Sequence, residues 1–162
     1  MNPENEPIIS IDNFNLTEFC KNAERDGVTH ISTGVAVVKD GRLLLVRRVK
    51  GDYLGGNYEL PGGGVDKGES LVQSALRELQ EETGLITKEV IGTFTGFDYT
   101  TDKKPHVRQI NFLVTVQNGA ITLNPIEHDD YKWVTVQDLT DIPMSSNMHN
   151  SVINALQLIK HL

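Results

Sequence analysis

The sequence is poor in several features that assign proteins to a class. Its single cysteine, Cys20, excludes an intrachain disulfide and favours a reducing compartment. Its longest uninterrupted apolar runs, 35–38 and 43–46, are far shorter than the roughly 20 residues of a transmembrane helix. The first residues are polar and acidic, unlike the basic and then apolar start of a signal peptide. We therefore expect a cytoplasmic protein that does not contact a membrane.

Positive charge is also scarce, because 15 Lys and Arg residues oppose 22 Asp and Glu residues, for a net charge of −7. Broad binding to a nucleic-acid backbone needs clustered Lys and Arg, so we do not expect it. Anionic small molecules are not excluded, since a divalent cation held by carboxylates reverses the local sign of the charge. With 162 residues, 38% of them apolar, the chain has the size and composition of one folded domain.

Hydrophobic periodicity predicts an α/β fold. Helical spacing occurs at 16–23, where Cys20 is expected in the core, at 70–84, and at 148–159. Strands interrupted by one helix and closed by another predict a mixed sheet covered on both faces. An Asp-Gly pair at 40–41 predicts a hairpin turn. The predicted strands are 31–39, 42–49, 58–60, 90–99, 107–116, 120–123 and 131–134.

The helix predicted at 70–84 is the most informative segment. Glu78, Glu81 and Glu82 stand at i, i+3 and i+4, so they share one polar face, on which Glu82 is expected to be exposed. The three carboxylates repel one another and crowd the helix C-terminus, where the helix dipole disfavours anions. This arrangement indicates a bound cation, and dense carboxylate oxygens suit Mg²⁺, or secondarily Mn²⁺, better than zinc. The competing interpretation is a solvated acidic face, with Arg77 paired to Glu81.

The residues around this helix carry a more specific signal. They match the fixed positions of the Nudix box at Gly63, Glu69, Arg77-Glu78-Leu79, Glu81-Glu82 and Gly84-Leu85. The chain therefore resembles a Nudix hydrolase over 31–162, and 1–30 is expected to be an N-terminal extension with a short helix. The resemblance implies a Nudix-type α/β/α sandwich with a mixed β-sheet, the box helix and a C-terminal helix. A P-loop is not supported, because Glu69 stands where the phosphate-binding Lys is required.

The resemblance also implies a metal site. Glu78, Glu81 and Glu82 would bind Mg²⁺, together with the carbonyl of Gly62 and a further carboxylate, Glu127, which stands six residues before Trp133. Glu81, Glu82 and Glu127 would be the catalytic residues. One of these carboxylates would hold or deprotonate the water that attacks phosphorus.

Other residues would support this site. Glu69 and Arg77 resemble the family's internal ion pair, which orients the acidic residues, and Gly63 would allow a close approach of the backbone. Asp129 and Asp130 are rivals of Glu127 on the same loop. The five histidines lack the spacing of metal ligands, and we interpret them as surface or structural residues.

The resemblance implies Mg²⁺-dependent cleavage of a pyrophosphate bond in a nucleoside diphosphate linked to another group. The alternative is a regulatory module that keeps this fold and senses a nucleotide. No subfamily marker outside the box identifies the substrate. The apolar face at 16–23 can pack on its own domain or on a second copy, which leaves a homodimer open. The candidate substrate-binding residues are Arg48 and the aromatic residues Phe97 and Tyr99.

Overall fold

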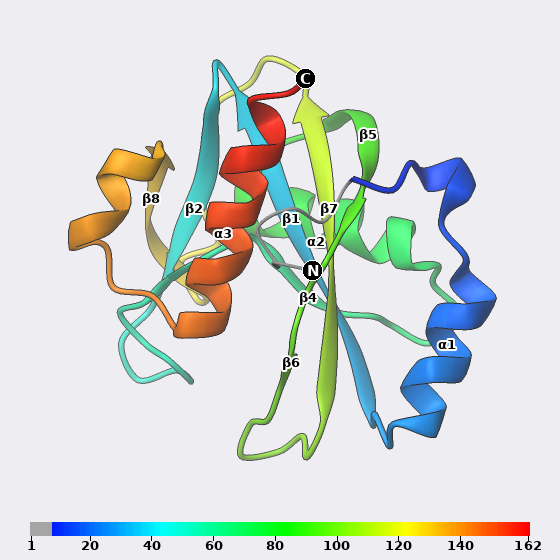
Figure 1. Ribbon diagram of the computed structural model, residues 1–162. Coiled ribbons are helices and arrows are strands. Elements are labelled where there is room, and N and C mark those ends of the chain that lie inside the picture. The colour runs from blue at the N-terminus through cyan, green and yellow to red at the C-terminus, as the bar shows by residue number, and fades with distance from the viewer. Residues whose placement is uncertain (1–7) are drawn as a thin grey trace.

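The computed structural model describes residues 8–162, and within them one mixed sheet of eight strands forms the centre of the fold (Figure 1). Five strands run in the order β3-β2-β1-β7-β5, while β4 pairs with β1, β6 with β7, and β8 with β2. β1 and β7 are parallel, and the other pairs are antiparallel. The strands are β1 (His30–Lys39), β2 (Arg42–Arg48), β3 (Tyr58–Glu59), β4 (Gly62–Gly64), β5 (Thr87–Phe94), β6 (Asp98–Tyr99), β7 (Val107–Val116) and β8 (His128–Val134).

Helices cover both faces of the sheet. Figure 1 shows α3 in front of the strands and α2 behind them. Side chains alternate along β1 accordingly, since Val35 and Val37 join the core under α2 whereas Ala36 joins the core under α3. The predicted α/β/α sandwich is therefore confirmed. The helices are α1 (Leu16–Arg25), α2 (Leu71–Thr83) and α3 (Ser146–Ile159), with short 3₁₀ helices at Ile11–Asn13 and Val136–Asp141.

Local signals correctly placed the turn between β1 and β2 and both ends of α2. Asp40 and Gly41 both have positive φ, 50° and 73°, as the predicted Asp-Gly hairpin turn requires. The Ser70 side chain accepts a hydrogen bond from the Gln73 amide at the start of α2. Gly84 ends the helix in the left-handed conformation, with φ 73°. No helix within residues 8–162 has the length and apolar character of a membrane span.

The predicted strand at 90–99 is two strands, because regular pairing with β7 is interrupted around Gly96. A Cβ at Gly96 would lie 1.8 Å from the carbonyl oxygen of Gln109, so the backbones touch where a side chain would stand. The side-chain amide of the buried Asn111 donates a hydrogen bond to the Thr95 carbonyl at 2.9 Å. This interruption separates β5 from β6.

The strand predicted at 120–123 is wrong. This segment lies against the C-terminus of α2, where helix carbonyls lack partners within the helix. The Thr122 amide donates to the carbonyl of Thr83 at 2.9 Å, and the Asn124 amide donates to the carbonyl of Glu82 at 3.3 Å. The segment therefore anchors the loop before β8 to the helix that carries the carboxylates.

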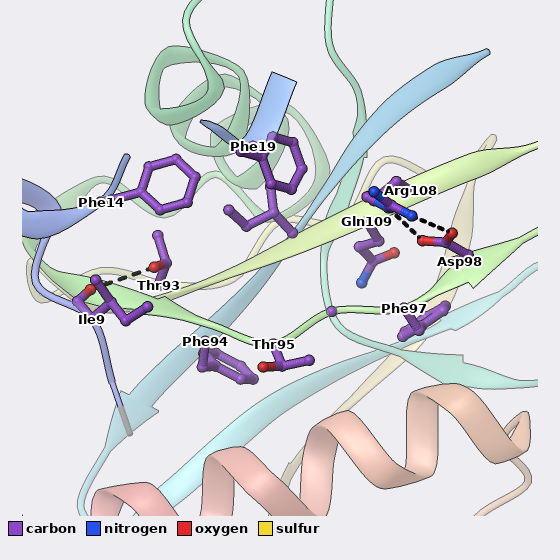
Figure 2. Close-up of a pocket in the computed structure, with 12 residues that line it drawn as sticks. Ile9, Phe14, Phe19, Thr93, Phe94, Thr95, Phe97, Asp98, Arg108 and Gln109 are labelled. Carbon is purple, nitrogen blue, oxygen red and sulfur yellow. Dashed lines mark hydrogen bonds and ion pairs between the residues drawn. The ribbon is translucent and has the colours of Figure 1, made fainter. Parts of the chain in front are cut away.

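The N-terminal extension packs on its own domain. Phe14 and Phe19 lie 5.8 Å apart between ring centroids and pack against the core under α2. A cavity of about 500 Å³ separates them from the edge of the sheet (Figure 2). At that edge Ile9 pairs its backbone with Thr93 through two hydrogen bonds of 2.8 and 2.9 Å. Residues 1–7 of the extension lie outside the described residues.

The expectation that Cys20 belongs to the core is wrong, because its side chain is exposed. Phe19 and Ala23 are one turn apart on the inner face of α1. Cys20 is rotated about 100° from Phe19 and is exposed, and Leu16, in the first turn of the helix, is 45% exposed. Helical spacing alone allowed either choice.

We predict that Phe19→Ala lowers the free energy of unfolding by about 1–2 kcal/mol, because it removes packing between α1 and the sheet. Leu16→Ala, at an exposed position of the same helix, should cost no more than about 0.5 kcal/mol. Urea unfolding of both variants measures the difference. Equal effects would mean that α1 is not held through Phe19.

Candidate metal and substrate site

The residues of β4, Gly62–Gly64, form a glycine turn that lies against the polar face of α2. Two carboxylates of α2 lie at this contact. The Glu82 carboxylate is buried, with 4% of the residue exposed, and accepts a hydrogen bond from the Gly62 amide at 2.9 Å. Glu78 is partly buried against Gly63, where a Cβ would lie 2.6 Å from its carboxyl carbon. Only glycine leaves room for this contact. The expectation that Glu82 is exposed is therefore wrong, whereas Glu81 does face solvent.

The charge of Glu82 is poorly compensated within the protein. Burial raises the pKa of Glu82 well above the ordinary glutamate range, and the negative charges of Glu59, Glu78 and Glu127 raise it further against the Gly62 hydrogen bond. Burial also raises the pKa of Glu78, although Arg77 opposes that shift. Carboxylates gathered in this way are stabilised in their charged form by a cation.

Arg77 supplies the only guanidinium that contacts this part of α2 within residues 8–162. Its Nε and Nη2 donate to Glu69 at 2.6 and 2.9 Å, and these bonds lower the pKa of Glu69 to about 2. Its Nη1 donates to Glu78 at 3.0 Å and to Glu81 at 3.1 Å. One arginine thus fixes the orientation of two of the three carboxylates that the Nudix box places on this helix.

Glu127 approaches the same carboxylates from the loop before β8. One ligand atom each of Glu82, Glu127 and His128 lies within 4.8 Å of the others. Two backbone hydrogen bonds place this loop. The Asn124 amide donates to the carbonyl of Glu82, and the Val49 amide donates to the carbonyl of Glu127 at 3.0 Å.

The two rivals of Glu127 have other partners. Asp129 forms an ion pair with Arg47 at 2.7 Å. Asp130 accepts a hydrogen bond from the Tyr58 hydroxyl, which helps to hold the pKa of Asp130 below its usual range. Asp129 and Asp130 are within β8, and of the three acidic residues only Glu127 belongs to the cluster around Glu82.

The donors fit a divalent metal ion. Most are carboxylate oxygens, the hard ligands that Mg²⁺ and Mn²⁺ prefer. The buried charge of Glu82 gives a cation a direct electrostatic role there. The cluster can therefore hold a metal ion between α2 and the loop before β8.

Sequence reasoning missed two residues beside this cluster. His128 is 2% exposed, and its Nε2 lies 2.9 Å from Oε1 of Glu59. Glu59 had a usable signal, since it stands between the core residues Tyr58 and Leu60 and so points away from the core. His128 had no signal in the sequence, because Glu59, the residue that it contacts, lies 69 positions away.

A pocket of about 400 Å³ adjoins the glycine turn and contains all three candidate substrate-binding residues. The rings of Phe97 and Tyr99 lie 5.7 Å apart between centroids, and the Tyr99 hydroxyl donates to Ser32 at 3.2 Å. Arg48 is on the wall of the same pocket. The arrangement provides an aromatic surface close to the carboxylate cluster, on which a planar ring could stack.

Comparisons with known proteins agree with this geometry. An ADP-ribose pyrophosphatase from Methanocaldococcus jannaschii is 34% identical over 119 residues, which cover 72% of this chain and 66% of that protein. An RNA pyrophosphohydrolase from Bartonella clarridgeiae is 31% identical over 112 residues, which cover 57% of this chain and 64% of that protein. The matches thus span just under two thirds of the length of these two relatives.

The fold has a solved counterpart in the MutT NUDIX hydrolase from Burkholderia pseudomallei. The two structures superpose with a TM-score of 0.67 at 26% identity, over 80% of this chain and 97% of the other. The family model described as NUDIX domain matches residues 28–156, which include all eight strands, the carboxylate helix α2 and most of α3. On this evidence the chain belongs to the NUDIX domain family.

Proposed function

We propose that this protein is a metal-dependent pyrophosphohydrolase that cleaves a phosphoanhydride bond in a nucleotide-type substrate, a nucleoside diphosphate linked to another group. The observation that carries the proposal is the meeting of Glu82, Glu78 and Glu127 beside the Gly62–Gly64 turn, next to an aromatic pocket. The names of the two relatives, an ADP-ribose pyrophosphatase and an RNA pyrophosphohydrolase, support the reaction class.

Each carboxylate would have a separate task. Glu78 and Glu82, oriented by Arg77 and Gly62, would hold Mg²⁺, with Mn²⁺ as a second candidate. Such an ion supplies neutralisation of phosphate oxygens and activation of water. Glu127, which is exposed at the edge of the cluster, would accept the proton of the attacking water. Glu81, which accepts a hydrogen bond from Arg77, would be a further metal ligand or would hold the attacking water.

The alternative, a sensor that binds a nucleotide without converting it, is separated by one assay. The protein is incubated with a panel of nucleoside triphosphates, dinucleotides and nucleotide sugars in Mg²⁺, and the nucleotide products are measured by chromatography against an EDTA control. Metal-dependent turnover supports the hydrolase. Binding without turnover would support the sensor. A homodimer and a cytoplasmic location stay predictions.

Glu82→Gln should reduce Mg²⁺-dependent turnover by on the order of 10²-fold, because it removes a charged metal ligand. The glutamine oxygen can still accept the Gly62 hydrogen bond, so the fold should persist. Steady-state kinetics in Mg²⁺ measures the loss, and activity within a few-fold of the wild type would contradict the metal assignment.

The same variant tests the buried charge. Because the pKa of Glu82 is raised by folding, its stability contribution is present below about pH 4.3, the unfolded value, and is lost as the pH rises through the folded pKa. In EDTA at pH 8, Glu82→Gln should therefore melt above the wild type, and the gap should close toward pH 4. A lower melting temperature at pH 8 would contradict the buried-charge interpretation.

Mg²⁺ and Mn²⁺ should raise the melting temperature of the wild type, since an ion that binds only the folded state stabilises it. Differential scanning calorimetry against NaCl of matched ionic strength separates binding from screening. A melting curve that is indifferent to millimolar Mg²⁺ and Mn²⁺ would favour a solvated acidic face instead.

Glu127→Gln should lower kcat with little change in melting temperature, since its carboxylate is exposed beside the cluster. Asp129→Asn is the matched control, because Asp129 is two residues away and pairs with Arg47. Steady-state kinetics on both variants measures the difference. Equal losses, or a silent Glu127→Gln, would remove Glu127 from the proposed machinery.

A further inference from the structure

Glu59 is a carboxylate beside the metal-binding cluster whose oxygens already have partners within the protein. It is close enough to Glu82 that, after burial, its negative charge helps to raise the pKa of that residue. Its Oε1 lies 2.9 Å from Nε2 of His128 and accepts from Nη1 of Arg48 at 3.0 Å, and its Oε2 accepts from the same Nη1 at 3.3 Å. Both oxygens are engaged, which favours a role other than that of a metal ligand.

Arg48 holds Glu59 in place and is itself held on its other sides. Its Nη2 donates to Asp52 at 2.7 Å, and its Nε donates to the Tyr53 carbonyl at 2.6 Å. All three guanidinium nitrogens are therefore used within the protein. A guanidinium anchored in this way gives the Glu59 carboxylate a defined position at the side of the cluster.

His128 depends on Glu59 for the hydrogen bonding of its ring. The residue is 2% exposed, and its Nδ1 is buried without a hydrogen-bond partner among residues 8–162. The contact of Nε2 with Glu59 is therefore the one hydrogen bond of the imidazole in the described part of the chain. Without Glu59, both ring nitrogens would be buried and unpaired, which is unfavourable, so the ring would move toward water.

A shift in register between β2 and β8 directs His128 to this place. Arg47 stands opposite Asp130, but Arg48 stands opposite His128, so Asp129 is an extra residue in β8. Regular pairing would put Asp129 opposite Arg48 and turn His128 to the other face of the sheet. The irregularity thus places the imidazole beside Arg48, where it meets the carboxylate on β3.

The position of the imidazole matters because His128 directly follows Glu127. The backbone amides of both residues donate to the Asn124 carbonyl, at 3.1 Å from Glu127 and 2.9 Å from His128. One ligand atom of each also lies within 4.8 Å of a carboxylate oxygen of Glu82. A movement of the buried ring would therefore move the neighbouring carboxylate relative to α2.

We propose that Glu59 and His128 are positioning residues, which keep Glu127 beside the carboxylates of α2. Arg48 fixes Glu59, and Glu59 fixes the imidazole of His128. This inference rests on the proposed hydrolase function, in which Glu127 accepts the proton of the attacking water. Because proton transfer requires close and well-aligned groups, a misplaced Glu127 slows the reaction without removing any contact to the substrate.

A double-mutant cycle with Glu127→Gln tests this path. With Glu127 in place, His128→Asn should lower kcat roughly 10–100-fold, with little change in KM, since residues that orient a metal-site group have effects of this order. Glu59→Leu, which keeps the size of the side chain but accepts no hydrogen bond, should act in the same direction. In the Glu127→Gln background each substitution should change kcat less than about twofold, because the residue through which it acts is already lost.

Two further variants separate positioning from a general structural role. His128→Gln is the matched control, because the glutamine amide nitrogen stands close to the position of Nε2 and can still donate to Glu59, whereas the shorter asparagine cannot reach it. It should keep most of the wild-type kcat. Phe19→Ala weakens packing far from the carboxylates and should leave kcat unchanged.

Three outcomes would overturn the inference while leaving the hydrolase intact. These are equal losses of kcat with and without Glu127, equal losses for His128→Asn and His128→Gln, or a higher KM at unchanged kcat for His128→Asn.

If the wild type converts no member of the nucleotide panel, the proposed function fails, and amide hydrogen exchange then tests the positioning by itself. The segment 124–128 should exchange faster in His128→Asn and Glu59→Leu than in the wild type, His128→Gln and Phe19→Ala, because the loop has lost the contact that fixes it. Equal exchange in all five proteins would refute the positioning role.

Discussion

The electrostatic cost of gathering carboxylates around the buried Glu82 is the constraint on which the rest of the site depends. Burial and three neighbouring negative charges oppose ionisation of Glu82, and a single backbone amide, that of Gly62, favours it. Arg77 contacts Glu69, Glu78 and Glu81, and no ion pair within residues 8–162 includes Glu82. A bound metal ion would offset this cost, which is why stability and activity should respond to the same ion.

The fold brings these charges together with few long-range contacts. β4 pairs with β1, so the glycine turn has a fixed place above α2. The segment at 122–124 hydrogen-bonds to the end of α2, so the loop with Glu127 meets the same helix. The tight passage at Gly62 excludes a side chain, because a Cβ there would lie 1.9 Å from the Thr33 carbonyl oxygen, and a Cβ at Gly63 would displace the Glu78 carboxyl group, whose carbon lies 2.6 Å away. The backbone and the carboxylates therefore determine each other's positions.

Cations are used sparingly in this acidic protein. Arg77 and Arg48 are each surrounded by carboxylates, so they organise the site and its pocket wall. The two lysines of the pocket, Lys103 and Lys104, have no such partners in the part of the chain that the structure describes. The two arginines are thus compensated within residues 8–162, whereas the two lysines are not. Because Asp52 and Glu59 compensate its charge, Arg48 is a weaker candidate for phosphate contact than its place on the pocket wall suggests.

The sequence by itself determined the features that depend on local spacing. The helix at 70–84, the shared face of Glu78, Glu81 and Glu82, and the hairpin at 40–41 follow from neighbouring residues, because capping, helical periodicity and turn conformation are short-range. The resemblance carried by the box around the helix extended this to the fold, and the NUDIX domain model that matches residues 28–156 agrees with it.

Only the tertiary structure decided how those residues differ from one another. Glu82 is buried and Glu81 exposed because the glycine turn covers one side of the helix face and solvent the other. Glu127 rather than Asp129 joins the cluster because Arg47 takes Asp129. Arg48 is neutralised by Asp52 and by Glu59, and Glu59 also meets His128, whose place in the sequence is remote. In each case the deciding partner comes from a distant part of the sequence. Burial and charge pairing depend on such long-range neighbours, which periodicity and local spacing do not identify.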